Sequence, residues 1–225
     1  MSRSVLFDTE TTGLDPLAGD RIIEIAVLEL IRDLPTGVVF HRLVDPQRDI
    51  DPDASRVHGL TRADLQGKPL FADIADELLD FIGDAKLVAH NASFDFGFLN
   101  AEMARIGRPS ICHTRKIDTL ELARTRFPGL PNSLDALCRR FGIDLSERTS
   151  HNALLDCRLL ADVYIELTGG RQRGFLLAAD AGLQLPAIQY QVSASRVPRP
   201  LLPSAAEIAA HAAFIARLQQ PVWLA

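Results

Sequence analysis

Two acidic residues at the end of an apolar run constrain this chain more than any other feature. Residues 5–7 (Val, Leu, Phe) predict the start of a buried β-strand, and Asp8 and Glu10 follow them closely. Residues i and i+2 of an extended chain point to the same side, so the two carboxylates should project together. Two like charges about 4 Å apart repel by roughly 4 kcal/mol at an effective dielectric of 20. The fold must offset this repulsion.

A shared proton, basic neighbours or a divalent cation could each offset it. No Lys or Arg lies between Arg3 and Arg21, so a hard cation with oxygen ligands is the most economical solution. The alternative is a strand that runs into an exposed turn at residues 11–13, with both acids solvated.

The chain has 225 residues, of which 47% are hydrophobic, enough for one sizeable core and an appendage. It begins with no secretory signal and contains no stretch of membrane-spanning length, so we expect a cytoplasmic protein without a membrane partner. Cys112, Cys138 and Cys157 lack CxxC spacing and lie among apolar neighbours, which predicts buried, unpaired thiols.

Charge is spread unevenly along the chain. Residues 1–170 hold 19 Lys and Arg against 27 Asp and Glu, whereas residues 171–225 hold 5 against 2. A protein that held nucleic acid by itself would present a basic face. If this chain acts on nucleic acid, metal ions or a partner must offset much of the repulsion.

Hydrophobic periodicity predicts a mixed α/β layer sandwich. After the opening strand, residues 21–30 and 37–44 read as two more strands of an antiparallel meander, and residues 45–67 as a long loop. Helices and strands then alternate, which is typical of one α/β body. We expect helices at 71–82, 94–106, 120–126, 134–141 and 153–167, and strands at 87–90 and 115–118.

The composition changes after Gly170. Residues 171–203 carry four prolines and little periodicity, which predicts a flexible linker. Ser204 and Glu207 have the spacing of a capping box, so residues 204–225 should contain a helix with an apolar stripe. The sequence therefore divides into a body (1–170), a linker and a C-terminal helix.

Two further acids occupy suggestive positions. Asp95 lies in the first turn of an expected helix that Ser93 could cap, although the helix dipole alone favours Asp there. Asp156 is flanked by leucines and is costly to bury unless it is paired or bound to metal. His151 can reach Asp156 only from the loop before the helix, because five helical positions would separate their faces. A surface or capping role for His151 is the alternative.

Three motifs stand in order along the chain: Asp8-x-Glu10-Thr-Thr-Gly13, His90-Asn-Ala-Ser-Phe-Asp95 and His151-x-Ala-x-x-Asp156. Together they resemble the motifs of the DEDDh exonucleases, which have an RNase H-like fold. Further matches are Phe127-Pro128-Gly129, the run at 132–138, Arg148-Thr149, Thr168-Gly169-Gly170 and the run at 207–211. With these, the chain is similar more narrowly to the proofreading epsilon subunits of bacterial DNA polymerase III.

The resemblance implies a 3′→5′ exonuclease that removes mispaired nucleotides from DNA 3′ ends. Asp8, Glu10 and Asp156 would hold two divalent cations, Mg²⁺ or Mn²⁺, with Asp95 contributing directly or through water. Two such ions suit an in-line phosphoryl displacement. His151, with an ordinary pKa near 6.5, would be the general base.

The resemblance also implies a set of substrate contacts. Glu10, Thr12, Asp53, His58 and Phe94 are expected at the terminal nucleotide of a single-stranded or frayed DNA end. Asp53 departs from the family, in which a Glu is usual. The alternatives are ordinary loop residues at Asp53 and His58, and a core role for Phe94.

The C-terminal part would bind partners at the bacterial replication fork. The expected partner is the catalytic (alpha) subunit of the polymerase. Gln172 and Phe175 have the Gln-x-x-apolar pattern of sliding-clamp-binding peptides, and a segment that packs back on the body is the alternative. The expected contacts to the polymerase are Ile208, Ala212, Ile215, Leu218 and Trp223.

Two rival functions remain open at this point. A DEDDh exoribonuclease would trim RNA 3′ ends by the same chemistry, but it has no need of the tail. A non-catalytic scaffold that stabilises a polymerase would not need all five catalytic positions filled.

Overall fold

The computed structural model describes residues 2–148, 150–169 and 202–217. Residue contacts divide the chain into two units, Met1–Leu176 and Leu177–Ala225. The first unit contains one five-stranded sheet in the order β3-β2-β1-β4-β5. The expected contacts Gln172, Phe175, Leu218 and Trp223 lie outside the described residues, so the clamp-binding pattern stays a prediction.

Three antiparallel strands begin the sheet, as the alternating sequence predicts. They are β1 (Arg3–Thr11), β2 (Ile22–Ile31) and β3 (Leu34–Leu43). The parallel strands β4 (Lys86–Ala89) and β5 (Lys116–Asp118) extend the sheet on the other side of β1. The strand β1 is therefore central, and its C-terminal end lies between layers of helices.

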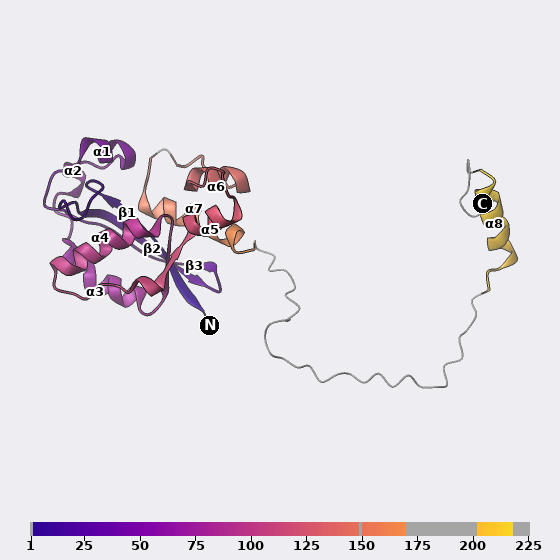
Figure 1. Ribbon diagram of the computed structural model, residues 1–225, viewed down its shortest axis with the longest axis horizontal. Coiled ribbons are helices and arrows are strands. Elements are labelled where there is room, and N and C mark those ends of the chain that lie inside the picture. Colours follow the sequence, from indigo (N-terminus) through magenta and orange to yellow (C-terminus); the bar gives the residue numbers. More distant parts are fainter. Residues whose placement is uncertain (1, 149, 170–201, 218–225) are drawn as a thin grey trace, which may run out of the picture. The chain divides into compact units, whose positions relative to one another are not determined.

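Each face of the sheet is covered by its own helices (Figure 1). Val5 and Phe7 of β1 pack against α3 (Phe71–Ile82) and α4 (Ala92–Arg105). Leu6 points to the opposite face, where α5 (Thr119–Arg126), α6 (Leu134–Phe141) and α7 (Ala153–Leu167) form a second core. Alternate residues of β1 thus face different helical layers, which decides where Asp8 and Glu10 point.

The region expected to be a loop, residues 45–67, contains two short helices, α1 (Pro52–His58) and α2 (Arg62–Leu65). Asp51 caps α1 by accepting a hydrogen bond from the backbone N–H of Asp53, and Pro52 opens the helix. Thr61 and Asp64 form a capping box at α2. The high Pro, Asp and Gly content concealed these signals, because the same residues also make turns.

Two local expectations were wrong. Cys112 is exposed, although Cys138 and Cys157 are buried as expected. The helix α4 begins at Ala92 behind the N-cap residue Asn91, so Ser93 is not its cap. The helix starts early because the Asp118 carboxylate accepts the backbone N–H groups of Asn91 and Ala92, at 3.1 and 3.0 Å.

The second unit contains α8 (Ala205–Ile215). Ser204 and Glu207 form the predicted capping box, with the Ser204 hydroxyl 2.8 Å from the Glu207 carboxylate. The apolar side chains of α8 are not buried: Ile208 is 56% exposed and Phe214 is 57% exposed. None of the helices among the described residues combines the length and apolar character needed to cross a bilayer.

Candidate active site

The end of β1 brings Asp8 and Glu10 to the face of the sheet that α7 covers. Both follow Leu6 in the alternation, and Leu6 belongs to the core beneath α7. Thr9, between them, points to the opposite face and meets α4. The structure thus confirms that the two carboxylates project together, on the buried side of a strand and not in an exposed turn.

Asp95 approaches the same strand from α4. Its Oδ1 accepts hydrogen bonds from the backbone N–H of Thr9 at 3.1 Å and from the Thr9 hydroxyl at 2.7 Å. Its side chain is 3% exposed, far below that of an ordinary first-turn acid on a helix surface. Asp118 supports this position, because it anchors the first residues of α4 to the end of β5.

The helix α7 contributes Asp156 and is anchored by a buried acid that the sequence analysis missed. Glu24, 1% exposed, lies opposite Glu10 in the β1–β2 ladder. Its carboxylate accepts hydrogen bonds from Asn152 Nδ2 at 2.8 Å and from the backbone N–H of Ala153 at 3.3 Å, so it binds the start of α7. One signal in the sequence could have revealed it. Glu24 interrupts the apolar run of residues 22–28, at a position where the strand alternation turns the side chain toward the core.

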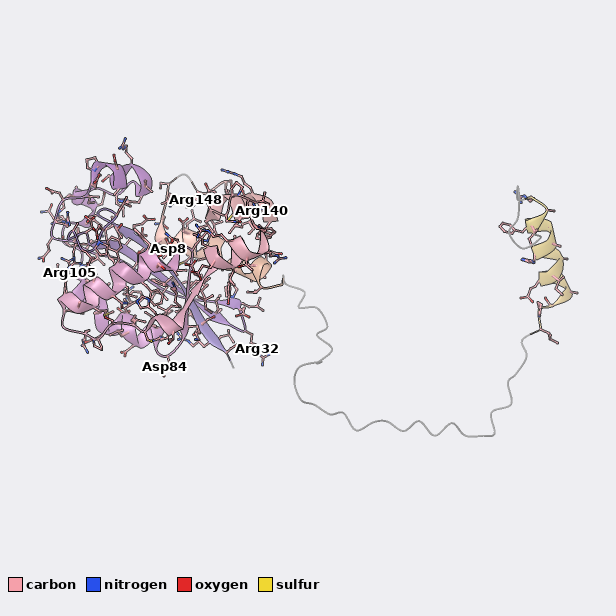
Figure 2. The ribbon with its side chains drawn as sticks, in the orientation of Figure 1. Asp8, Arg32, Asp84, Arg105, Arg140 and Arg148 are labelled. Atoms are coloured by element: carbon pink, nitrogen blue, oxygen red, sulfur yellow. The ribbon has the colours of Figure 1, made fainter. Side chains whose placement is uncertain are left out.

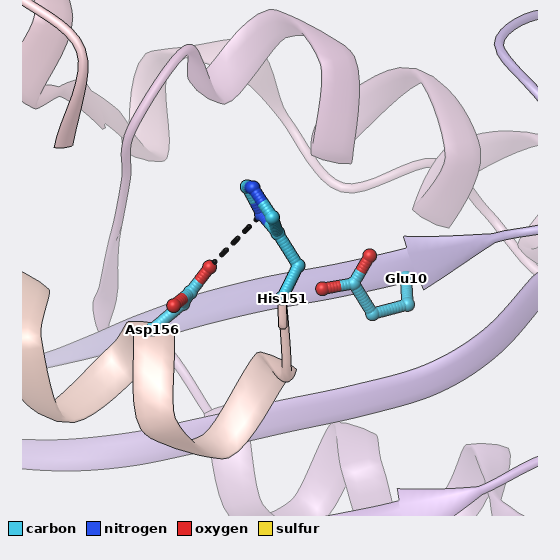
Figure 3. Close-up of side chains that lie close together, drawn as sticks. All are labelled: Glu10, His151 and Asp156. Carbon is cyan, nitrogen blue, oxygen red and sulfur yellow. Dashed lines mark ion pairs between the residues drawn. The ribbon is translucent and has the colours of Figure 1, made fainter. Parts of the chain in front are cut away.

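His151 stands in the loop before α7, as the spacing required. Its backbone N–H donates to the Val57 carbonyl at 3.1 Å, which ties the loop to α1. Its Nδ1 lies 3.3 Å from Asp156 Oδ2 (Figure 3). One ligand atom each from Glu10, His151 and Asp156 lies within 4.8 Å of the other two. The structure therefore brings the expected base and two expected metal ligands into one group.

These side chains line an open cavity of about 910 Å³. Asp8, Asp95 and His58 also face it. Apolar side chains from several elements form part of its wall, namely Leu14, Val57, Phe94 and Leu130. Its apolar wall can hold a flat apolar group, and cations bound to the clustered acids would let it hold an anionic group beside that wall.

The clustered acids have strongly perturbed pKa values. Burial raises the pKa of Asp8 well above its ordinary value, and the charge of Asp95 raises it further. Burial and the charge of Asp156 raise the pKa of Glu10 to about 8. Burial also raises the pKa of Asp95 to about 7, although the hydrogen bonds from Thr9 oppose the shift. The acids therefore retain protons at neutral pH unless a cation binds.

Asp156 differs because it has a cationic partner. Burial would raise its pKa, but the hydrogen bonds from Arg148 and His151 outweigh burial and hold the pKa below its ordinary value. Arg148 Nε and Nη2 each lie 2.7 Å from one oxygen of the Asp156 carboxylate. The hydrogen bonds to Asp156, and then the charges of Asp156, Asp135 and Asp8, raise the pKa of Arg148 above its ordinary value (Figure 2 labels Arg148 and Asp8).

The residues present fit a divalent metal centre. Their donors are carboxylate oxygens, the ligands that Mg²⁺ and Mn²⁺ prefer. The raised pKa values of Asp8 and Glu10 are those of acids that lack enough positive charge nearby. Bound cations would supply that charge.

The expected substrate contacts divide into two groups. His58, Phe94 and Glu10 line the cavity, and Phe94 also packs on Phe98, with ring centroids 4.9 Å apart. His58 is 6% exposed and its Nε2 has no hydrogen-bond partner among the described residues.

Thr12 and Asp53 are not placed on the cavity wall. The Thr12 hydroxyl is buried in its own loop, where it lies 3.0 Å from Asp20 Oδ1 and 3.0 Å from the backbone N of Arg21. Asp53 is 79% exposed and forms an ion pair with Arg56. Their side chains are engaged elsewhere, so the geometry gives no support to the expected contacts.

The metal-free protein should lose stability as pH rises from about 4.5 to about 8. The folded pKa values of about 8 for Glu10 and 7 for Asp95 exceed the ordinary values of 4.5 and 3.8, so the folded state binds more protons than the unfolded state. This stabilisation is complete below about pH 4 and is lost through pH 7 to 8. Each pH unit in this window costs about 1.4 kcal/mol per carboxyl that must release its proton.

Urea unfolding in the presence of a chelator measures this slope. The Glu10→Gln variant is the matched control, because it removes one of the titrating carboxyls and should flatten the slope. An unfolding free energy that rises over this window in the wild-type protein would contradict the raised pKa values.

Comparisons with known proteins agree with this site. The family model described as exonuclease, of the RNase T type, matches residues 5–164. The DNA polymerase III subunit epsilon of Rickettsia felis is 51% identical over 176 residues, which cover 77% of each chain. The subunit of the same name from Escherichia coli is 41% identical over 230 residues, 98% of this chain and 95% of that one.

Solved structures show the same architecture. Exonuclease X in complex with 5′ overhanging duplex DNA is 30% identical, with a TM-score of 0.57 over 75% of this chain and 91% of that chain. The nuclease domain of 3′hExo, a DEDDh family member bound to rAMP, has a TM-score of 0.63 at 18% identity, over 74% and 92% of the two chains. Divalent-metal dependence is general for this fold, and the acidic cluster fits it. The chain therefore belongs to the exonuclease family and, within it, to the DNA polymerase III epsilon subunits, the proofreading 3′→5′ exonucleases.

Proposed function

We propose that this exonuclease removes mispaired nucleotides from DNA 3′ ends with two divalent cations, Mg²⁺ or Mn²⁺, held by Asp8, Glu10, Asp95 and Asp156. The observation that carries the proposal is the convergence of four carboxylates from β1, α4 and α7 on one cavity. When bound, two such ions would stabilise the attacking and leaving oxygens of an in-line phosphoryl displacement.

His151 accepts the proton of the attacking water. Its side chain is about half exposed, so it can meet solvent, and Asp156 lies 3.3 Å from its Nδ1. A neutral imidazole that donates Nδ1–H to Asp156 keeps the Nε2 lone pair free for the water proton. The terminal phosphodiester bond then breaks, and the terminal nucleotide leaves as a 5′-monophosphate.

The remaining cavity residues bind the terminal nucleotide. His58 lines the cavity as a buried ring, and burial lowers its pKa so that the ring is neutral and can hydrogen-bond the sugar or phosphate. Phe94, Val57 and Leu14 supply apolar surface for the base. A terminal base that is frayed from its partner can reach this wall, which favours mispaired ends.

The tail tethers the exonuclease to the polymerase alpha subunit in the bacterial cytoplasm, at the replication fork. The residues of α8 are capped but not buried, and its apolar side chains are available to a groove on another protein. Ile208 and Ile215 keep this role in the proposal. The relatives named DNA polymerase III subunit epsilon support such a partner.

Asp8→Asn combined with Glu10→Gln should abolish hydrolysis of a 3′-labelled single-stranded DNA and leave the metal-free melting temperature unchanged or higher. The amides keep the side-chain volume but remove the repelling charges and the metal ligands. The matched control is Asp80→Asn with Asp84→Asn, two exposed acids remote from the cavity. Retained hydrolysis, or a metal-free melting temperature lowered by many degrees, would refute the metal site.

His151→Ala should lower turnover by roughly 10²- to 10⁴-fold while Mn²⁺ binds with near wild-type affinity, as expected for loss of a general base. Single-turnover cleavage and a calorimetric Mn²⁺ titration measure the two quantities. His211→Ala, an exposed site in α8, is the control. If Mn²⁺ affinity falls together with turnover, His151 is a metal ligand instead.

Removal of residues 171–225 should leave cleavage of short single strands almost unchanged and abolish co-purification with the polymerase alpha subunit. The catalytic residues all lie in the first unit, whereas the proposed contact surface lies in the second. Unfolding of the shortened protein, or full-strength binding to the polymerase, would show that the tail is not the tether.

A further inference from the structure

Arg148 binds the carboxylate that the metal site needs. Its Nε and Nη2 donate to the two oxygens of Asp156 at 2.7 Å each, a bidentate fork, and its side chain is 9% exposed. Arg124 also lines the cavity but is exposed. Arg148 is thus the arginine placed directly against the acidic cluster.

A metal ion on Asp156 and this fork on Asp156 oppose each other. A divalent cation binds a carboxylate oxygen at about 2.0 to 2.6 Å, while the guanidinium already lies 2.7 Å from both oxygens. Two cations on one carboxylate repel, and burial strengthens this repulsion. Full occupancy of the metal site therefore requires Arg148 to loosen its hold on Asp156.

A second acid is in place to keep the displaced guanidinium. Asp135, in the first turn of α6, accepts a hydrogen bond from Arg148 Nη1 at 2.5 Å and lies on the cavity wall. Its side chain is 37% exposed, and it is not part of the cluster on β1, α4 and α7. Arg148 thus contacts one acid of the metal site and one acid outside it.

We propose that Arg148 is the built-in counter-cation of the metal-free site, and that metal binding transfers its guanidinium from Asp156 to Asp135. This inference rests on the proposed function, because it presumes that Asp156 is a metal ligand. In the metal-free protein, the guanidinium partly neutralises an acidic cluster that would otherwise repel itself.

The transfer also changes what His151 can do. Arg148 Nη2 lies 3.0 Å from His151 Nδ1, and Asp156 Oδ2 lies 3.3 Å from the same nitrogen. Arginine can only donate, so Nδ1 cannot accept from Arg148 and donate to Asp156 at once. When the guanidinium departs, Nδ1–H can donate to Asp156, and the Nε2 lone pair can accept the proton of the water. Metal occupancy thereby favours the tautomer that a general base needs.

Arg148→Gln and Asp135→Asn should shift metal affinity in opposite directions. Without the guanidinium, Mn²⁺ should bind about tenfold more tightly or better, and the metal-free melting temperature should fall. Without its second acid, Arg148 stays on Asp156, and Mn²⁺ should bind several-fold more weakly. Calorimetric Mn²⁺ titration and thermal unfolding in chelator, both on the full chain, measure the two effects.

Arg139→Gln is the matched control. Arg139 is 73% exposed and pairs with Oδ2 of Asp135 at 3.8 Å, whereas Arg148 contacts Oδ1, so loss of Arg139 should leave Mn²⁺ affinity unchanged within about twofold. A purely structural Arg148 predicts that Arg148→Gln lowers both affinity and stability, and that result would overturn the proposal. Wild-type protein that binds no Mn²⁺ would instead refute the metal site itself.

The Nε–H resonance of Arg148 gives a second measurement that needs no variant to fold. It should shift on saturation with Mg²⁺ in the wild-type protein, because Nε loses the Asp156 oxygen. An unchanged resonance at saturating Mg²⁺ would show that the fork persists and would overturn the exchange.

Discussion

Repulsion among buried carboxylates is the interaction on which this structure depends. Asp8, Glu10, Asp95 and Asp156 meet in one cavity, where burial and then the charges of the neighbouring carboxylates raise the pKa values of Asp8 and Glu10. The fold holds them together because the strand and the two helices that carry them are packed into the two buried cores. The cluster is therefore a site that is completed by added positive charge.

The central strand determines how the cluster is divided between layers. Successive residues of β1 face opposite helical layers. Thr9 therefore donates hydrogen bonds to Asp95 of α4, while Glu10 faces α7. Glu24 on the neighbouring strand anchors the start of α7, and this contact places Asp156 and His151 beside Glu10. Two hydrogen-bonded links, one on each face, thus set the spacing of the catalytic groups. The sheet, more than the loops, therefore fixes the positions of the catalytic side chains.

Local sequence pattern predicted what depends on local geometry. The shared direction of Asp8 and Glu10 follows from strand alternation, and the position of His151 before its helix follows from helical spacing. The roles of Arg148 and Asp135 could not be obtained in this way, because each depends on a contact between separate elements. The burial of Glu24 could have been inferred from the apolar run that it interrupts, but its contact with the start of α7 could not. Asp51 and Thr61 cap α1 and α2, and these capping residues were visible in the sequence. The two helices were still predicted as a loop, because turns use the same residue types. Cys112 was misplaced because apolar neighbours in sequence do not guarantee burial in space.

Proton release on metal binding measures the charge state of the cluster directly. Calorimetric titration with Mg²⁺ at pH 7, in two buffers of different ionisation enthalpy, reports the number of protons that leave when the metal binds. With the pKa of Glu10 near 8 and that of Asp95 near 7 in the metal-free protein, about one proton or more should be released at pH 7, and far less at pH 9.5. Saturable Mg²⁺ binding with the same heat in both buffers at pH 7 would contradict a cluster that holds protons in place of metal.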